Sequence, residues 1–361
     1  MAESAGADSR LPVAAGSVTL NGRPLRIWLP AIRAGSGADV FTNRLATGLR
    51  RAGHEADVHW FAHQWEFATW SLRAARIPPD VDIVHASSVL AHAFAGRGIP
   101  CVVTEHQFIR HPEFMPWRGR LQSLYHDIVL APMVTRSLRR ADRIVSVSRH
   151  VADAIEADIR RPVRVIHNWV DTQVFRPREG FVRDGDGPLR VLFVGNPSRW
   201  KGADVIPVLS SMLGDEVEVH CVGGLRRAFP SDWVRHKNIR VLQSVPPERM
   251  LEIYASVDTV LVPTRYEAFG FVALEAMSCG LPVIGFDTTG TAEVCANGET
   301  ALLVPRDDID GLAKSIRALA DPDLRATMGR AGRERALSCF TEDQGVSAYL
   351  SLYGEVLGGR A

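Results

Sequence analysis

Residues 259–286 constrain the fold of this chain more than any other stretch. An apolar run at 259–263 is followed by a loop with Gly270, a helical segment that ends at Gly280, and a second apolar run at 282–286. Short, continuous apolar runs are typical of strands buried in a parallel sheet, and glycine is a common helix end. The order predicts a strand–loop–helix–strand unit. Its loop then lies at the carboxyl end of a strand, where open α/β sheets bind ligands.

Two acidic residues flank the loop and the start of the predicted helix. Glu267 stands in the loop, and Glu275 follows eight residues later in the helix. A helix N terminus presents unpaired amides, here near Gly270 and Phe271, and such amides suit a phosphate. A carboxylate accepts hydrogen bonds from hydroxyl groups such as those of a sugar. An ordinary helix with solvated glutamates fits the same residues, so the pattern alone leaves both interpretations open.

The same segment carries a family signature. The chain resembles the retaining glycosyltransferases of family 4, which have the GT-B fold, in Glu267-Ala-Phe-Gly-Phe-Val-Ala-Leu-Glu275 and in the flanking residues 265–266 and 276–282. The resemblance implies an α/β fold with two Rossmann-like, doubly wound parallel-sheet domains that face each other across a cleft. It also implies that Glu275 binds ribose hydroxyls and that Glu267 contacts the sugar. The other donor-binding residues implied in this segment are Ala268, Phe269, Gly270, Phe271 and Val272.

A second informative loop follows the apolar run at 189–195. The family pattern has Arg directly after the glycine that ends this run and Lys five residues later. Lys201 matches that pattern, whereas Asn196 stands at the arginine position. The resemblance implies that Lys201 balances the charge of a leaving diphosphate. Arg199 is the candidate that replaces the missing cation, and Asn196 is expected at the donor site. Solvated surface cations remain the alternative.

The first half of the chain adds candidates of the same kind. A predicted strand at 25–30 leads into a loop with Gly35 and Gly37 and then into a helix. By resemblance, this loop faces the donor diphosphate, His106 lies beside the transferred sugar, and Val245 belongs to the corner that packs on the nucleotide base. Taken without the resemblance, the glycine pair fits a plain tight turn equally well, and a structural role is favoured for the single histidine.

The length of 361 residues exceeds the size at which one hydrophobic core keeps growing, so two domains are expected. We expect a flexible tail at 1–22, an N-terminal acceptor-side domain at 23–176, and a linker at 177–188. A C-terminal donor-side domain follows at 189–340. A final helix at 341–361 crosses back, by resemblance, to the first domain.

Composition excludes several classes of function. With 42 basic and 41 acidic residues the net charge is +1, which does not favour nucleic-acid binding. No apolar run approaches the roughly 20 residues of a membrane helix. Five scattered cysteines indicate neither a disulfide framework nor a metal site and favour a cytoplasmic location. No His/carboxylate cluster with metal-ligand spacing appears, so we expect no cofactor and no metal.

Residues 110–150 are basic and partly amphipathic. Arginines outnumber acidic residues there, and one predicted helical face carries Leu121, Leu124, Tyr125, Ile128 and Val129. Such a face more often packs on a core, and that is the interpretation favoured here. Peripheral contact with the anionic inner face of a membrane is the alternative, and an anionic acceptor such as a lipid diphosphate is another use for the arginines.

By its resemblance to family 4, the chain is expected to be a retaining, hexosyltransferase-type glycosyltransferase. It would move a sugar from a UDP- or GDP-sugar to an acceptor hydroxyl on a glycan, a glycolipid or a small molecule, as in polysaccharide, lipopolysaccharide or other glycoconjugate synthesis. Two alternatives stay open. One is a sugar-nucleotide 2-epimerase on the same fold. The other is a non-catalytic sugar-nucleotide binding or scaffold protein, which Asn196 favours because a missing cation weakens leaving-group stabilisation.

Overall fold

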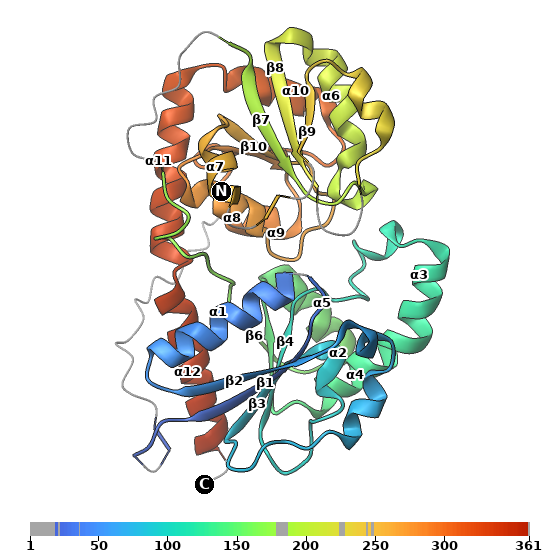
Figure 1. Ribbon diagram of the computed structural model, residues 1–361, viewed down its shortest axis with the longest axis vertical. Coiled ribbons are helices and arrows are strands. Elements are labelled where there is room, and N and C mark those ends of the chain that lie inside the picture. Colours follow the sequence, from blue (N-terminus) through green and yellow to red (C-terminus); the bar gives the residue numbers. More distant parts are fainter. Residues whose placement is uncertain are drawn as a thin grey trace, which may run out of the picture.

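The computed structural model describes residues 19–20, 22–35, 37–177, 187–223, 228–242, 245–246 and 249–359. Most of the expected tail (1–22) and of the expected linker (177–188) lies outside these residues. The described part contains two six-stranded sheets whose neighbouring strands are all parallel (Figure 1). Helices cover both faces of each sheet, so the predicted α/β architecture with two doubly wound domains is confirmed.

The first sheet has the strand order β2-β1-β3-β4-β5-β6. Its strands are β1 (Arg26–Ile32), β2 (Glu55–Phe61), β3 (Ile83–Ser87), β4 (Cys101–Glu105), β5 (Arg143–Ser146) and β6 (Val163–Val165). The helices of this half are α1 (Gly37–Arg51), α2 (Ser88–Ala91), α3 (Arg120–Tyr125), α4 (Ala131–Arg140) and α5 (Arg149–Ile159), with a π-helical turn, η4 (His126–Leu130), between α3 and α4.

The second sheet has the order β12-β11-β10-β7-β8-β9. Its strands are β7 (Leu189–Val194), β8 (Val217–Val222), β9 (Ile239–Leu242), β10 (Thr259–Val262), β11 (Val283–Phe286) and β12 (Ala301–Val304). The helices are α6 (Ile206–Leu213), α7 (Met250–Ala255), α8 (Phe271–Ser278), α9 (Thr289–Val294), α10 (Ile309–Ala318), α11 (Pro322–Cys339) and α12 (Glu342–Gly358).

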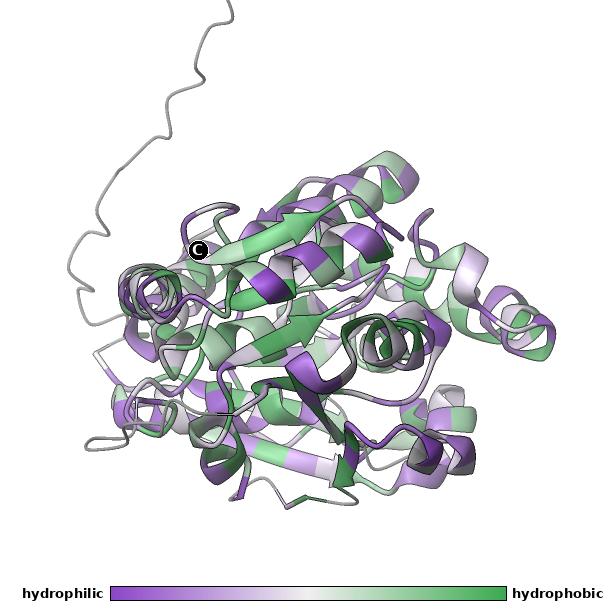
Figure 2. Cartoon of the chain, turned by 90° about the horizontal axis from the view of Figure 1, so that it is seen from above, coloured by the Kyte–Doolittle hydropathy of each residue, from purple (hydrophilic) through white to green (hydrophobic). Residues whose placement is uncertain are grey.

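The strands read as unbroken apolar runs because both faces of each sheet are buried. In β1, Trp28 packs into the core under α2, α4 and α5, while Ile27 and Leu29 pack into the core under α1 and α12. The second sheet alternates in the same way, with Val260 toward α8 and Leu261 toward α6 and α10. Figure 2 shows strands coloured as hydrophobic in the interior and mixed colours on the outer helices.

Helix α12 packs on the first domain although it ends the chain. Thr341 and Gln344 form a capping box at its start, which fixes its first turn. The Tyr353 hydroxyl lies 2.6 Å from Nδ1 of the buried His85 in β3. Helices α11 and α12 run along one side of the molecule, and α3 stands on the opposite side (Figure 1).

The strand order reverses at one point in each sheet. In the first sheet β1 and β3 are neighbours, and in the second β7 and β10 are neighbours. At such a point the loops that leave the two strands diverge to opposite faces and open a crevice at the carboxyl ends, where α/β folds bind ligands. The loops after β1, β7 and β10 begin there, and these loops hold most of the predicted site residues.

The favoured interpretation of the helix near residue 120 as core-facing is wrong. Leu121, Leu124 and Ile128 are 84%, 58% and 64% exposed. In α4 the buried face is formed by Val134 and Leu138. The π-helical turn η4 interrupts the α-helical spacing between α3 and α4, and α3 projects beyond the sheet (Figure 1). The apolar face of α3 therefore points to solvent.

One glycine next to the β7 loop is required by its surroundings. Gly202 has φ +73°, and an added Cβ would overlap the carbonyl oxygen of Pro263. Gly298 has φ +80° with open space around it. We expect Gly202→Ala to lower the free energy of unfolding by about 3 kcal/mol, the sum of left-handed strain and overpacking, and Gly298→Ala by about 1 kcal/mol. Urea denaturation checks this, and equal losses for the two variants would contradict it.

Candidate active site

The loop between β10 and α8, residues 263–270, forms the centre of the site. Gly270 lies directly before α8 with φ +108°, and no side chain of the described residues caps this helix end. Glu267 is held by the backbone, since its N–H donates to Thr289 Oγ1 at 2.9 Å and its carbonyl accepts from the Gly290 N–H at 2.8 Å. The start of α8 directly follows the loop that carries Glu267, and its uncapped amides are available to an anion.

Lys201 and Glu267 come from loops of two neighbouring strands, β7 and β10, and meet there. The Lys201 Nζ lies 2.6 Å from Glu267 Oε2, with the two side chains 21% and 17% exposed. The ammonium also lies 4.6 Å from the centroid of the Trp200 ring. A charged pair that is mostly but not fully buried keeps a cation and an acceptor fixed at the point where the strand order reverses.

The other two candidates of the β7 loop differ in environment. The Arg199 side chain is exposed, and its backbone carbonyl accepts a hydrogen bond from Arg265. Asn196 is partly buried, and its Oδ1 has no hydrogen-bond partner among the described residues. A buried amide oxygen without a partner is costly, so Asn196 is suited to accept a hydrogen bond from a ligand.

Glu275 lies on the first turns of α8, where both of its oxygens already have partners. Tyr254 donates its hydroxyl to Oε2 at 3.1 Å, and Arg44 Nη2 lies 3.5 Å from Oε1. Burial raises the pKa of the Glu275 carboxyl, while Arg44 and the Tyr254 hydrogen bond act in the opposite direction. Arg44 belongs to α1, so Glu275 links the two domains.

The glycine loop of the first domain lies against the start of α8. An added Cβ on Gly37 would contact the Phe271 ring at 3.6 Å, and the Arg44 guanidinium lies 5.3 Å from the centroid of the same ring. The amide of Gly35 donates to Asp39 Oδ2 at 2.8 Å. This amide is thus already paired with the first turn of α1.

The remaining predicted residues surround this centre. Phe269 is buried and packs against Phe271, with ring centroids 5.4 Å apart, while Ala268, Val272 and Val245 are partly buried at the edge of the same core. His106 follows β4 and packs on Phe41 with centroids 4.5 Å apart. Burial lowers the pKa of His106 to about 4, so its imidazole is neutral at pH 7. Among described residues, neither His106 nor Val245 bonds to the Lys201–Glu267 pair.

Sequence reasoning missed three residues of this site: Arg44, Tyr254 and Thr289. Arg44 follows Phe41 by three residues in α1, so helical spacing placed it on the face toward the glycine loop. That spacing was the available signal. Tyr254 and Thr289 reach Glu275 and Glu267 through tertiary contacts, and no local pattern marks them.

The described residues contain no group of three or more His, Cys, Asp or Glu side chains arranged to hold a metal ion. No helix in the described part of the chain is long and apolar enough to cross a bilayer.

Comparison with known families gives two matches. The family described as glycosyl transferases group 1 matches residues 181–335, and the family described as glycosyltransferase family 4 matches residues 60–174. The chain is 37% identical over 304 residues to the N-acetyl-α-D-glucosaminyl L-malate synthase of Bacillus anthracis, covering 77% of this chain and 76% of that protein. It is 29% identical over 346 residues to a D-inositol 3-phosphate glycosyltransferase of Acidothermus cellulolyticus, covering 85% and 74%.

Solved structures show the same fold. Sucrose-phosphate synthase from Thermosynechococcus elongatus superposes with a TM-score of 0.79 at 20% identity, covering 93% of this chain and 100% of that one. Anabaena HepE in complex with UDP-glucose superposes with a TM-score of 0.69 at 17% identity, covering 93% and 100%.

Proposed function

The chain belongs to glycosyltransferase family 4, and we propose that within this family it is a retaining hexosyltransferase. It transfers the sugar of a UDP- or GDP-sugar to an acceptor hydroxyl, in the synthesis of a polysaccharide, lipopolysaccharide, glycolipid or other glycoconjugate. The observation that carries the proposal is the Lys201–Glu267 pair, 2.6 Å apart, beside the uncapped N terminus of α8. A cation, an acceptor and free amides at one strand edge match the diphosphate and the hydroxyls of a sugar nucleotide.

Each residue of the pair has a distinct task. The ammonium of Lys201, with Arg199 as the second cation, balances the charge that develops on the leaving diphosphate. Glu267 accepts hydrogen bonds from the sugar, and Glu275 from the ribose. The acceptor oxygen attacks from the face that the diphosphate leaves, and a phosphate oxygen takes the acceptor proton. In this scheme no carboxylate of the enzyme forms a covalent bond with the sugar, and no metal ion or cofactor takes part.

The solved complexes support the donor class. Anabaena HepE has been crystallised with UDP and with UDP-glucose, and its fold is shared by this chain. The neutral His106 suits a hydrogen bond to a sugar hydroxyl better than a charged imidazole would, because it offers both a donor and an acceptor nitrogen.

The proposal is tested first by donor binding and then by turnover. A panel of UDP-, GDP- and ADP-sugars is expected to raise the melting temperature only for the true donor, because a ligand stabilises the state that binds it. That donor is then incubated with acceptor glycans and glycolipids in the presence of EDTA. We expect a glycoside with the donor's anomeric configuration. Conversion of the donor without an acceptor would instead indicate an epimerase, and binding without any turnover a binding protein.

We also propose that this enzyme contacts an anionic membrane, on its cytoplasmic face, through the outer side of residues 110–150. Leu121, Leu124 and Ile128 form an exposed apolar face on α3 and η4. A further exposed aromatic residue, Phe67, extends it, since its ring lies 6.1 Å from that of Tyr125 of α3, centroid to centroid. Contiguous exposed apolar side chains mark interaction surfaces.

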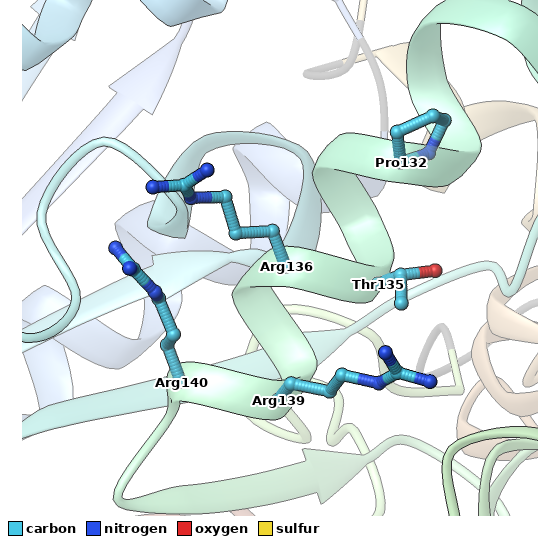
Figure 3. A pocket seen from close by; sticks show the side chains of 5 residues that line it. All are labelled: Pro132, Thr135, Arg136, Arg139 and Arg140. Atoms are coloured by element: carbon cyan, nitrogen blue, oxygen red, sulfur yellow. The ribbon is translucent and has the colours of Figure 1, made fainter.

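Basic side chains continue this surface along α4. A pocket of about 340 Å³ on the outside of α4 is lined by Pro132, Thr135, Arg136, Arg139 and Arg140. Figure 3 shows Arg136 and Arg140 extending to the same side and Arg139 to the other. The guanidinium groups of Arg140 and Arg73 lower the pKa of Arg136. In the described part of the chain, none of Arg136, Arg139 and Arg140 forms an ion pair. Cations next to an apolar face suit an anionic lipid surface.

Charge removal on α4 gives a measurable test of this contact. We expect the double variant Arg136→Gln/Arg140→Gln to bind phosphatidylglycerol vesicles about 25-fold more weakly, because each basic residue contributes about 1 kcal/mol near such a surface. Ile128→Ser should weaken binding as well, whereas Leu337→Ser, which removes an exposed leucine on α11, should not. Vesicle co-sedimentation provides the measurement, and equal binding of all variants would contradict the contact.

A further inference from the structure

Glu293, on α9 of the second domain, binds the first domain through both of its oxygens. Oε2 accepts from the Arg149 backbone N–H at 2.8 Å and lies 3.1 Å from His167 Nε2. Oε1 accepts from the His150 backbone N–H at 2.9 Å and lies 2.9 Å from His150 Nδ1. Arg149 and His150 begin α5, so a carboxylate of one domain satisfies the free amides of a helix in the other.

The opposite end of α9 holds the loop with Glu267. Thr289 and Gly290, the first two residues of α9, make the two backbone contacts of Glu267 at 2.9 and 2.8 Å. An added Cβ on Gly290 would lie 2.7 Å from the Phe269 backbone, so the helix and the loop are in close contact. The C-terminal end is fixed too, since Arg335 of α11 donates to the Glu293 carbonyl at 3.0 Å.

Helix α9 is only six residues long, from Thr289 to Val294. One end contacts the active-site loop, and the other end contacts the first domain. Because the helix has fewer than two turns, we expect its two ends to move together when one of them is displaced. The orientation of Glu267 and the approach of the two domains are thus joined through a single short element.

The carboxylate of Glu293 is well suited to hold this contact. Its side chain and that of His150 are 22% and 18% exposed, so water screens the pair less than a surface pair. Burial alone would raise the pKa of Glu293, but hydrogen bonds from His150 and His167 and from the amides of Arg149 and His150 hold that pKa well below its ordinary value. Glu293 is therefore negatively charged at neutral pH.

We propose that Glu293 is a positioning residue that clamps the first domain onto the donor loop and so couples domain closure to the placement of Glu267. It touches no reacting atom. Its consequence for sugar transfer rests on the proposed function, whereas the clamp itself is a contact between domains and needs no substrate. An open interface admits water to the donor, so loss of the clamp favours donor hydrolysis over transfer.

The test compares Glu293→Gln with wild type in two measurements. Small-angle scattering of the full chain without ligand is expected to show a larger radius of gyration for the variant. With donor and acceptor present, the ratio of donor hydrolysis to transfer is expected to rise about tenfold, the low end of what losing hydrogen bonds to a charged group costs. Glu299→Gln, at an exposed glutamate five residues after α9 ends, should match wild type in both.

A second variant guards against a simple folding defect. His167→Ala removes one of the partners and leaves the start of α5 intact, and it should shift both measurements in the same direction by less. Wild-type compactness and a wild-type ratio in Glu293→Gln and His167→Ala would overturn the proposal. A parallel loss of hydrolysis and transfer at unchanged compactness would overturn it too, because it indicates a structural role alone. If wild type transfers no sugar, the scattering comparison still decides the clamp.

Discussion

Replacing Lys201 by alanine is expected to lower kcat/KM for sugar transfer by about 10²- to 10³-fold, the usual loss when one preorganised group that stabilises a developing anion is removed. The ammonium, in the loop after β7, lies 2.6 Å from Glu267. There it balances the charge of the diphosphate as the bond to the sugar breaks. Alanine also leaves the mostly buried carboxylate of Glu267 without its counter-charge. Initial rates with donor and acceptor below their KM values give the ratio directly.

The matched control for this variant is Lys314→Ala. Lys314 is an exposed lysine on α10, outside the loops that form the site, so its loss should leave kcat/KM at the wild-type value. Melting temperatures of both variants establish that the chain is folded. Full activity of the Lys201→Ala enzyme would rule out Lys201 as the cation that stabilises the leaving group.

Glu267→Gln is expected to lower kcat/KM by about 10- to 150-fold, because a hydrogen bond to a charged group is worth about 1.5–3 kcal/mol. Glutamine keeps the size of the side chain and its carbonyl acceptor but loses the charge that pairs with Lys201 and grips the sugar hydroxyls. The loss is finite because Glu267 positions the sugar and forms no covalent bond with it. The loss in kcat/KM is measured from initial rates of Glu267→Gln. The control is Glu334→Gln, which changes an exposed glutamate of α11.

The pair should act as a unit. Since Lys201 and Glu267 are in direct contact, the double variant is expected to lose less than the product of the two single losses. The scheme would be contradicted if Glu267→Gln were completely inactive and a sugar were also found covalently bound to the enzyme in another variant. Such a bound sugar would indicate a covalent intermediate.

The fold was predictable because its signals are local. Apolar runs such as 259–263 form strands buried on both faces, and glycines such as Gly270 mark the loops at their carboxyl ends. Two parallel sheets then follow from the alternation of strands and helices. The resemblance to the family pattern pointed to Glu267 and Lys201, and the two side chains meet because β7 and β10 are neighbouring strands.

Other features depend on contacts between distant residues, and no local pattern specifies them. Arg44 and Glu275 are far apart in the chain and meet only because α1 of one domain faces α8 of the other. Glu293 likewise meets Arg149 and His150 only through a contact between the two domains. The outward face of α3 was predicted wrongly, because periodicity identifies an apolar face but does not say whether a core lies next to it, and the π-helical turn is not visible in the sequence.

A crystal structure with an intact UDP- or GDP-sugar tests the central claim most directly. We predict diphosphate oxygens within about 2.7–3.2 Å of Lys201 Nζ and of amides at the start of α8, with sugar hydroxyls on Glu267. A donor bound elsewhere, for example with its diphosphate on the arginines of α4 while Lys201 stays paired with Glu267 alone, would contradict the account.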